Sequence, residues 1–160
     1  MWTAEFYDFK NPRSFATSGG LGTMGYGLGA AIGAKVGNPD KTVINIAGDG
    51  SFYMNMNELS TLAKYNLPVI ELVMNNSVLG MVRQWQKLFY GGRFSNTTLE
   101  KNTDFEMLGK AFGINAFTIR KKSDIRPVLE KAIKLNQPVL IDCHIDKDIN
   151  VLPMVPAGSS

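Results

Sequence analysis

The chain has 160 residues, a net charge of +3 and a single cysteine, Cys143. With 44% hydrophobic and 19% charged residues, it has the composition of a globular protein with one substantial core, and we expect one domain over residues 1–160. The mild, scattered positive charge argues against nucleic-acid binding, and no apolar run reaches the length of a membrane span. One cysteine excludes an internal disulfide.

Residues 1–15 are rich in aromatic side chains without clear periodicity, so we expect this segment to lie against something else. Residues 19–27 contain five glycines, which let the backbone approach a ligand closely. A helix should follow and end at residues 37–40. The positions predicted to form its apolar face toward a sheet are Leu28, Ala31, Ile32 and Val36.

The glycine stretch also contains a weak dinucleotide-binding motif. Gly20 to Gly25 matches G-x-G-x-x-G, and the acidic Asp49 follows a later strand. However, residues 13–18 do not resemble the strand that should precede such a motif, and Asp49 lies further along the chain than the usual twenty or so residues. A nucleotide-binding module without catalytic activity is therefore the second hypothesis.

Residues 43–76 should form a strand, a helix and a second strand. The first strand, Val43 to Ala47, is apolar enough to be buried and runs into Gly48-Asp49-Gly50. The second, Val69 to Met74, ends in Asn75-Asn76. Between them, Asn66 and Pro68 should end a helix whose apolar face is formed by Met54, Leu59, Leu62 and Ala63.

Such a unit brings Asp49 and Asn76 together, because parallel strands end at the same edge of a sheet. Glycine-aspartate and paired asparagines are each more often ordinary turns or caps. Their joint placement favours a Mg²⁺ ion held by carboxylate and amide oxygens. The backbone N–H groups of Gly50 and Ser51 should face the phosphates that accompany such an ion.

The rest of the chain continues the alternation of helices and strands. Residues 78–89 have helical spacing that places Trp85 in a core, and residues 95–102 should form a loop. His144, like Cys143, is expected to be structural. The remaining predictions are a helix capped by Asp104 and ended by Gly113, a strand at 115–119, a helix at 124–135 capped by Ser123, a strand at 139–144 and an extended tail at 146–160. The sum is an α/β fold, a mostly parallel sheet with helices on both faces.

Gly48-Asp49-Gly50, then 24 residues, then Asn75-Asn76 resembles the signature of thiamine diphosphate enzymes, and implies their three-layer fold. In that family the aspartate, the second asparagine and a main-chain carbonyl bind Mg²⁺, which anchors the cofactor diphosphate. By resemblance, the metal ligands here are Asp49, Asn76 and the carbonyl of Val78.

A longer match covers nearly the whole chain. Residues 17–27, 48–50, 75–76 with 79–86, and 151–156 resemble the C-terminal, diphosphate-binding domain of acetolactate synthase catalytic subunits, with Gly29 where that family often has proline. The resemblance implies a substrate channel along Met81, Val82 and Trp85. The cofactor contacts that it implies are Gly22, the main chain near Met24, Gly48, Gly50, Ser51, Met54, Asn76, Gly80 and Met81.

By the same resemblance, the reaction is decarboxylation of pyruvate and condensation with a second pyruvate or with 2-oxobutyrate, in branched-chain amino-acid biosynthesis. The activating glutamate of the family lies on a pyrimidine-binding domain of a neighbouring subunit, so we expect no catalytic residue on this chain and no activity from it alone. We expect a fragment of a longer three-domain chain, cytoplasmic or, in a eukaryote, organellar. Its expected assembly is a homodimer or homotetramer, with FAD on another domain and possible pairing with a regulatory small subunit. Another thiamine diphosphate-dependent decarboxylase or carboligase is the nearest alternative.

Overall fold

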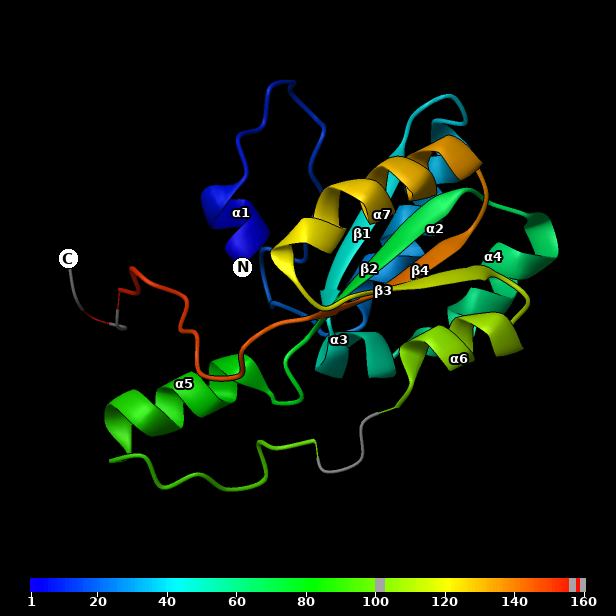
Figure 1. Ribbon diagram of the computed structural model, residues 1–160. Coiled ribbons are helices and arrows are strands. Elements are labelled where there is room, and N and C mark those ends of the chain that lie inside the picture. The colour runs from blue at the N-terminus through cyan, green and yellow to red at the C-terminus, as the bar shows by residue number, and fades with distance from the viewer. Residues whose placement is uncertain (100–102, 156–157, 159–160) are drawn as a thin grey trace.

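The computed structural model describes residues 1–99, 103–155 and 158, and shows four parallel strands with helices packed against them (Figure 1). The strand order is β1-β2-β4-β3. Along the chain, the elements are α1 (Trp2–Phe6), α2 (Tyr26–Gly37), β1 (Val43–Gly48), α3 (Asp49–Tyr53), η1 (Met56–Glu58), α4 (Leu59–Tyr65), β2 (Val69–Asn75), α5 (Gly80–Phe89), α6 (Phe105–Ala111), β3 (Asn115–Ile119), α7 (Lys122–Leu135) and β4 (Val139–His144).

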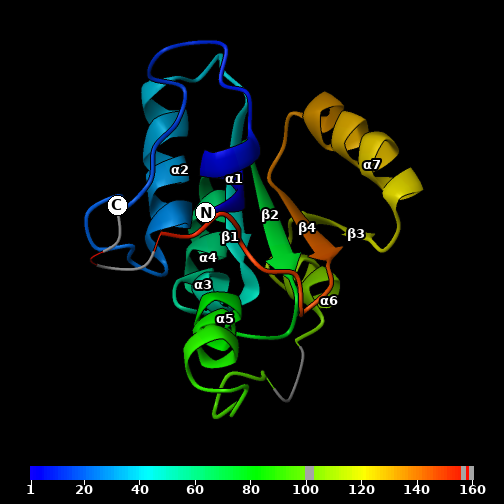
Figure 2. The same ribbon diagram turned by 90° about the vertical axis from the view of Figure 1, so that its left-hand side faces the viewer.

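The two faces of the sheet carry separate apolar clusters. Side chains from α2, α4 and α6 form one cluster with β2, in which Leu59 and Leu62 are fully buried. Side chains from α7 form the other cluster with β3 and β4, centred on Val139 and Ile141. Figure 2 shows α2 and α7 on opposite sides of the sheet. The predicted parallel sheet with helices on both faces is confirmed.

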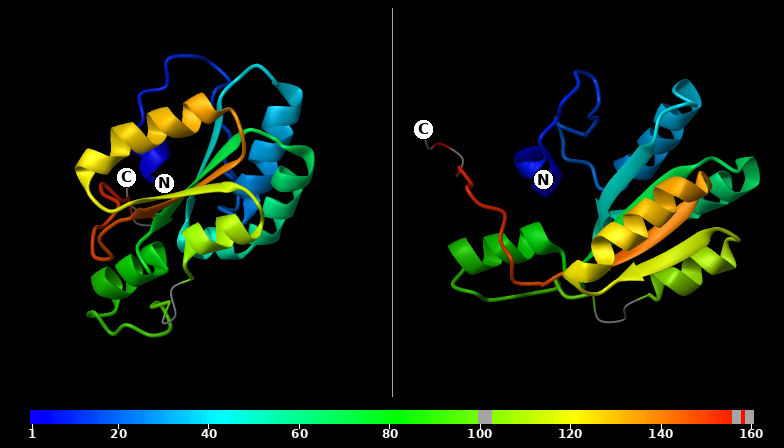
Figure 3. Two further views of the ribbon diagram at one scale, coloured as in Figure 1. Left: turned by 45° about the vertical axis from the view of Figure 1, so that its right-hand side comes forward. Right: turned by 45° about the horizontal axis from the view of Figure 1, so that its top comes forward.

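The pairing of the strands fixes where their carboxyl ends lie. Gly48 of β1 lies opposite Met74 of β2, and Asn75 of β2 lies opposite His144 of β4. Three strands therefore finish at one edge, as expected for parallel neighbours joined by crossover connections. Beyond this edge, α5 and the C-terminal tail extend away from the sheet (Figure 3, right).

The strand β1 is less buried than predicted. Asn45 and Ala47 face the α2 side and are buried, but Ile44 and Ile46 on the other side are 42% and 41% exposed. The expectation of a buried strand was thus wrong for one face. The reason is that α7, the helix on that side, packs with β3 and β4 and leaves β1 uncovered.

The apolar face of α2 also differs at one position. Leu28 and Ala31 are buried as predicted, but Val36 is 64% exposed and Lys35 is buried instead. The Lys35 ammonium donates hydrogen bonds to the carbonyl oxygens of Pro39 and Lys41, at 2.8 and 2.7 Å. A lysine can bury its aliphatic stem wherever its charge finds such acceptors, which hydrophobic periodicity cannot foresee.

The predicted helix after Asp49 is divided into three pieces, α3, η1 and α4. The chain leaves helical geometry at Asn55, whose φ of −145° turns the following residues onto a new axis. As a result, Met54 is 62% exposed and is not part of the apolar face, whereas Phe52 is buried. The predicted end of the helix at Asn66 is confirmed by its left-handed backbone.

The predicted starts of α6 and α7 have different outcomes. Asp104 caps α6 as predicted, accepting a hydrogen bond of 2.8 Å from the backbone of Met107. The cap of α7 was wrong: the helix begins before Ser123, and the carboxylate of Asp124 accepts the N–H groups of residues 120 and 121. The five-residue helix α1 was not predicted. Residues 100–102 of the predicted loop, and residues 156, 157, 159 and 160 of the tail, lie outside the described part.

Candidate cofactor and metal site

The two halves of the predicted site meet at the carboxyl edge of the sheet. β1 runs directly into Asp49, and β2 runs into a turn formed by Asn76, Ser77 and Val78. The backbone N–H of Ser77 donates a hydrogen bond of 2.8 Å to Oδ2 of Asp49. The structure therefore brings together two motifs that are more than twenty residues apart in the sequence.

Asp49 is a buried carboxylate with few compensating contacts. It is 3% exposed, and its Oδ1 accepts the N–H of Gly50 at 2.9 Å. Burial raises the pKa of Asp49 above its ordinary value, and hydrogen bonds from backbone N–H groups offset only part of that effect. A divalent cation beside this side chain would favour its ionised form, because it would supply the missing opposite charge.

The turn after β2 has a constrained backbone. Oδ1 of Asn76 accepts the N–H of Val78 at 3.2 Å, and Ser77 adopts a left-handed φ of 59°. The loop that follows α5 faces this turn. The two are hydrogen-bonded through the N–H of Leu79 and the carbonyl of Ser77. The carbonyl of Val78 lies between these two groups and takes no part in that pairing.

The glycine stretch is hydrogen-bonded to the same region through the backbone of Gly25. Its N–H donates to Oγ of Ser51 at 3.0 Å, and its carbonyl accepts from Nδ2 of Asn55 at 3.2 Å. Gly25 has a left-handed φ of 84°, and a Cβ there would lie 2.9 Å from Cβ of Met54. Only glycine fits this position, which begins α2 and lies beside α3.

A side chain at Gly50 would require two neighbouring side chains to move. A Cβ at this position would lie 2.7 Å from a methyl group of Leu79 and 3.3 Å from the methyl group of Met24. Met24 and the turn after β2 therefore both reach the backbone next to Asp49. By contrast, Gly20, Gly22 and Gly48 have open space where a Cβ would be, and Gly80 has Nδ2 of Asn76 at 3.0 Å.

The helix α5 exposes its apolar side chains. Val82 and Trp85 are 51% and 50% exposed, and Met81 is half-buried. The Trp85 ring lies edge-on to the ring of Phe89, with their centroids 5.8 Å apart. The prediction of Trp85 in a core was therefore wrong. Periodicity located the apolar face correctly, but α5 stands beyond the strand ends, where no described element covers that face (Figure 3).

The buried residue of α5 is the polar Gln84. Its Nε2 donates to the carbonyl of Val151 at 2.8 Å, and its Oε1 accepts the N–H of Val151 at 2.7 Å. Next to it, Arg83 pairs with Asp148 at 2.8 Å. The C-terminal tail is thereby held along α5, close to the carboxyl edge.

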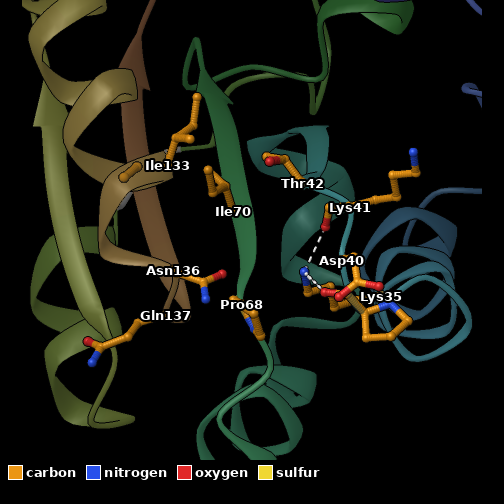
Figure 4. A pocket seen from close by; sticks show the side chains of 11 residues that line it. Lys35, Asp40, Lys41, Thr42, Pro68, Ile70, Ile133, Asn136 and Gln137 are labelled. Atoms are coloured by element: carbon orange, nitrogen blue, oxygen red, sulfur yellow. Dashed lines mark hydrogen bonds between the residues drawn. The ribbon is translucent and has the colours of Figure 1, made fainter.

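A pocket of about 280 Å³ lies at the opposite edge of the sheet (Figure 4). It is lined by Thr42 and Pro68, which precede β1 and β2, and by Asn136 and Gln137 after α7. The Lys35 ammonium is turned toward the carbonyls of Pro39 and Lys41 (Figure 4). Because the predicted site residues follow the other ends of these strands, this pocket is not part of the site.

The contacts among three polar residues at the carboxyl edge were missed by the sequence analysis. Nδ2 of Asn75 donates to Oδ1 of Asp142 at 2.9 Å, and Nε2 of His144 lies 3.1 Å from Oδ2 of Asp142. A carboxylate inside the apolar run of β4 was the available signal, because a buried charge requires a partner.

The described residues contain no group of three or more His, Cys, Asp or Glu side chains arranged to hold a metal ion. A cation at this edge would therefore depend on Asp49 together with amide and main-chain oxygens. Among the described residues, no helix is both long and apolar enough to cross a bilayer.

Comparison with known proteins identifies the family. Residues 1–143 match the family described as thiamine pyrophosphate enzyme, C-terminal TPP binding domain. The chain belongs to this family. The structure agrees with that assignment and not with the dinucleotide motif at Gly20 to Gly25, because no strand is formed at residues 13–18.

Similar proteins are acetolactate synthases. The large subunit from Pyropia yezoensis is 49% identical over 100% of this chain. Isozyme 2 of Escherichia coli strain K12 is 47% identical over 100% of it, and the mitochondrial catalytic subunit of Saccharomyces cerevisiae is 46% identical over 99%. The chain spans only 27%, 29% and 23% of these three proteins.

Among solved structures, a thiamine diphosphate-dependent 4-hydroxybenzoylformate decarboxylase from Rhodococcus jostii RHA1 has a similar fold. It superposes with a TM-score of 0.72 and 28% identity, over 77% of this chain and 23% of the decarboxylase. The fold of this chain is therefore shared with part of a thiamine diphosphate-dependent decarboxylase.

Proposed function

We propose that this chain is the C-terminal cofactor-binding domain of an acetolactate synthase that depends on thiamine diphosphate and Mg²⁺. The observation that carries this proposal is the hydrogen bond from Ser77 to Asp49, which joins the two halves of the family's signature at one sheet edge. The identity of 46–49% with acetolactate synthases along almost the whole chain supports this enzyme over other members of the family.

The residues present suit a magnesium ion. Asp49 offers a buried carboxylate whose two oxygens each accept one backbone N–H and retain further lone pairs. Asn76 offers its amide oxygen and Val78 its main-chain carbonyl, and hard oxygen ligands of this kind are the ones that Mg²⁺ prefers. We assign these three residues as the ligands that would hold the ion.

The cofactor diphosphate would lie against Gly48, Gly50 and Ser51. The N–H of Gly50 donates to Oδ1 of Asp49, so this amide supports the metal ligand and is not free to point at the phosphates. Bound thiamine diphosphate supplies the carbon nucleophile and accepts the electron pair that decarboxylation releases. The further proposed cofactor contacts are Gly22, Met24, Met54, Asn76, Gly80 and Met81.

Exposed methionines support this placement. Met54 is 62% exposed beside the half-buried Gly25, and Met24 is 43% exposed beside the buried Gly50. Large apolar side chains at such positions leave apolar surface for a ligand to cover. Met81, Val82 and Trp85 on α5 would line the approach of the substrates.

The remaining parts of the proposal concern the longer protein. Because the relatives are more than three times longer than this chain, we propose that it is one domain of a three-domain subunit. Its substrates would be pyruvate and 2-oxobutyrate. The activating glutamate would come from a neighbouring subunit of a homodimer or homotetramer. FAD would bind elsewhere, and a regulatory small subunit would be a further partner.

Titration calorimetry of the 160-residue chain with thiamine diphosphate tests the cofactor assignment. We expect weak binding that requires Mg²⁺. Asp49→Ala and Asn76→Ala should each weaken it at least about 100-fold, because each removes a metal ligand. The matched control is Asp40→Ala, an exposed aspartate at the opposite edge, which should bind like the unmodified chain.

Two outcomes would contradict the proposal. One is binding of NAD without a metal, and the other is unchanged cofactor affinity in both ligand variants. A separate assay addresses the missing domains: we expect no turnover of pyruvate by this chain alone, and acetolactate formation by it would disprove the need for a glutamate from another domain.

A further inference from the structure

Two buried polar side chains outside the proposed ligands are hydrogen-bonded to each other near the ends of β2 and β4. Asn75 is 4% and Asp142 is 5% exposed, and Nδ2 of Asn75 donates to Oδ1 of Asp142 at 2.9 Å. The other carboxylate oxygen of Asp142 lies 3.1 Å from Nε2 of His144. Burying a carboxylate is costly unless both oxygens are paired, so this pair is a built feature of the sheet edge.

The pair continues to the proposed metal ligand through Ser77. The hydroxyl of Ser77 donates to Oδ1 of Asn75 at 3.3 Å, and its backbone N–H donates to Oδ2 of Asp49 at 2.8 Å. The main chain of Asn75 is held as well, since its carbonyl accepts the N–H of Ile145 at 2.9 Å. Four residues on three strand ends thus form one continuous chain of hydrogen bonds.

The backbone of Ser77 shows that these bonds hold a conformation in place. Its φ of 59° is left-handed, which is unfavourable for a residue with a Cβ. Glycine would adopt this conformation freely, but it would lack the hydroxyl that reaches Asn75. The turn that presents Asn76 and Val78 is therefore held by the bonds on either side of Ser77.

We propose that Asp142 is a positioning residue for the metal site, acting through Asn75 and Ser77 on Asp49 and on the turn that carries Asn76. This inference rests on the proposed function. Residues that orient the direct ligands set metal affinity because they hold the ligand oxygens in the geometry that the ion needs. Asp142 itself touches neither the ion nor the cofactor.

Amide hydrogen exchange and calorimetry of the 160-residue chain test the proposal independently. In Asp142→Leu, the Ser77 amide should exchange at least about tenfold faster while the mid-strand amide of Val73 is unchanged. The Mg²⁺ concentration for half-maximal thiamine diphosphate binding should rise about 10- to 100-fold. Asp142→Asn should restore most of both, since its amide oxygen still accepts from Asn75.

Two further variants keep the test decisive. Asp146→Asn removes a carboxylate from the same segment without touching Asn75, and should match the unmodified chain in both measurements. Ser77→Ala breaks the next bond without altering the buried strands, and should shift both quantities in the direction of Asp142→Leu. This variant decides the question if Asp142→Leu exposes the mid-strand amides as well.

The outcomes separate the two proposals. Absence of metal-dependent cofactor binding in the unmodified chain would refute the proposed function, while the Ser77 amide would still report on the hydrogen-bond chain. Unchanged exchange at Ser77 and an unchanged Mg²⁺ requirement, in Ser77→Ala or in a folded Asp142→Leu, would overturn the role of Asp142. Equal defects in Asp142→Asn and Asp142→Leu would also overturn it, because the hydrogen bond would then not be the cause.

Discussion

The middle of β2 and its carboxyl end are adjacent but chemically opposite. Before that end, Val69 and Val73 are fully buried against leucine and phenylalanine side chains of α4 and α6. At the end, Asn75, Asn76 and Ser77 make side-chain hydrogen bonds to three different parts of the chain. The first part of β2 therefore packs in the hydrophobic core, and its carboxyl end contributes to the candidate site.

This difference suggests that stability and binding can be altered separately. Apolar contacts in the middle of the strand contribute to the free energy of unfolding in proportion to the area that they bury. The polar end contributes little apolar area, but it sets where ligand oxygens lie. Substitutions in one region should thus leave the property of the other largely unchanged.

Phe105→Ala should give the largest change in stability. Phe105 is 1% exposed, belongs to the same cluster as Val73, and has its ring 5.4 Å from those of Phe52 and Tyr53. Removing it should lower the free energy of unfolding by about 3–5 kcal/mol in urea titrations. Met107→Ala on the exposed side of α6 is the control, and an equal loss there would contradict the assignment of the core.

Glu71→Gln tests the one ionisable group in the middle of β2. Glu71 is fully buried, both its oxygens accept from Nδ2 of Asn45, and burial raises its pKa from 4.5 to about 8. The folded state therefore keeps a proton that the unfolded state loses above pH 4.5. This stabilisation is complete below pH 4.5 and decreases until about pH 8.

The measurement is urea unfolding at several pH values between 5 and 8. The unmodified chain should lose up to about 1.4 kcal/mol per pH unit relative to Glu71→Gln, which cannot titrate. Glu130→Gln on the exposed side of α7 should follow the unmodified chain. Parallel pH profiles for Glu71→Gln and the unmodified chain would show that Glu71 is ionised in the fold.

Trp85→Ser should have the smallest effect on stability. Half of this side chain is exposed, so the free energy of unfolding should change by only about 0.5 kcal/mol. Gln84→Ala on the same helix should cost about 1–2 kcal/mol, because it leaves both backbone groups of Val151 without their partner. The reverse order in thermal unfolding would mean that Trp85 is packed in the interior.

Much of the fold follows from local sequence patterns. The four strands, the turn residues at their ends and the approach of Asp49 to the turn after β2 all depend on short apolar runs and on the geometry of parallel strands. Periodicity was less informative where a second partner decides burial. It located the apolar face of α5 but not the absence of a cover over Trp85, and it chose Val36 over Lys35.

The hydrogen-bond partners of the site were not predictable in this way. Asn75 and Asp142 are 67 residues apart, and they meet only because β4 pairs with β2 instead of lying beyond β3. Single polar residues inside apolar strands, Glu71 in β2 and Asp142 in β4, were the visible signs. The sequence did not indicate which hydrogen-bond partner each of these residues would have.

The strand order β1-β2-β4-β3 also affects how the chain folds. β1 and β2 can pair as soon as the first half of the chain is available, but the other edge of β2 must remain open until the last strand arrives. Pairing over such separations is slow, since loop closure precedes the gain in contacts. The carboxyl edge should therefore be completed late in folding, after the scaffold around it has formed.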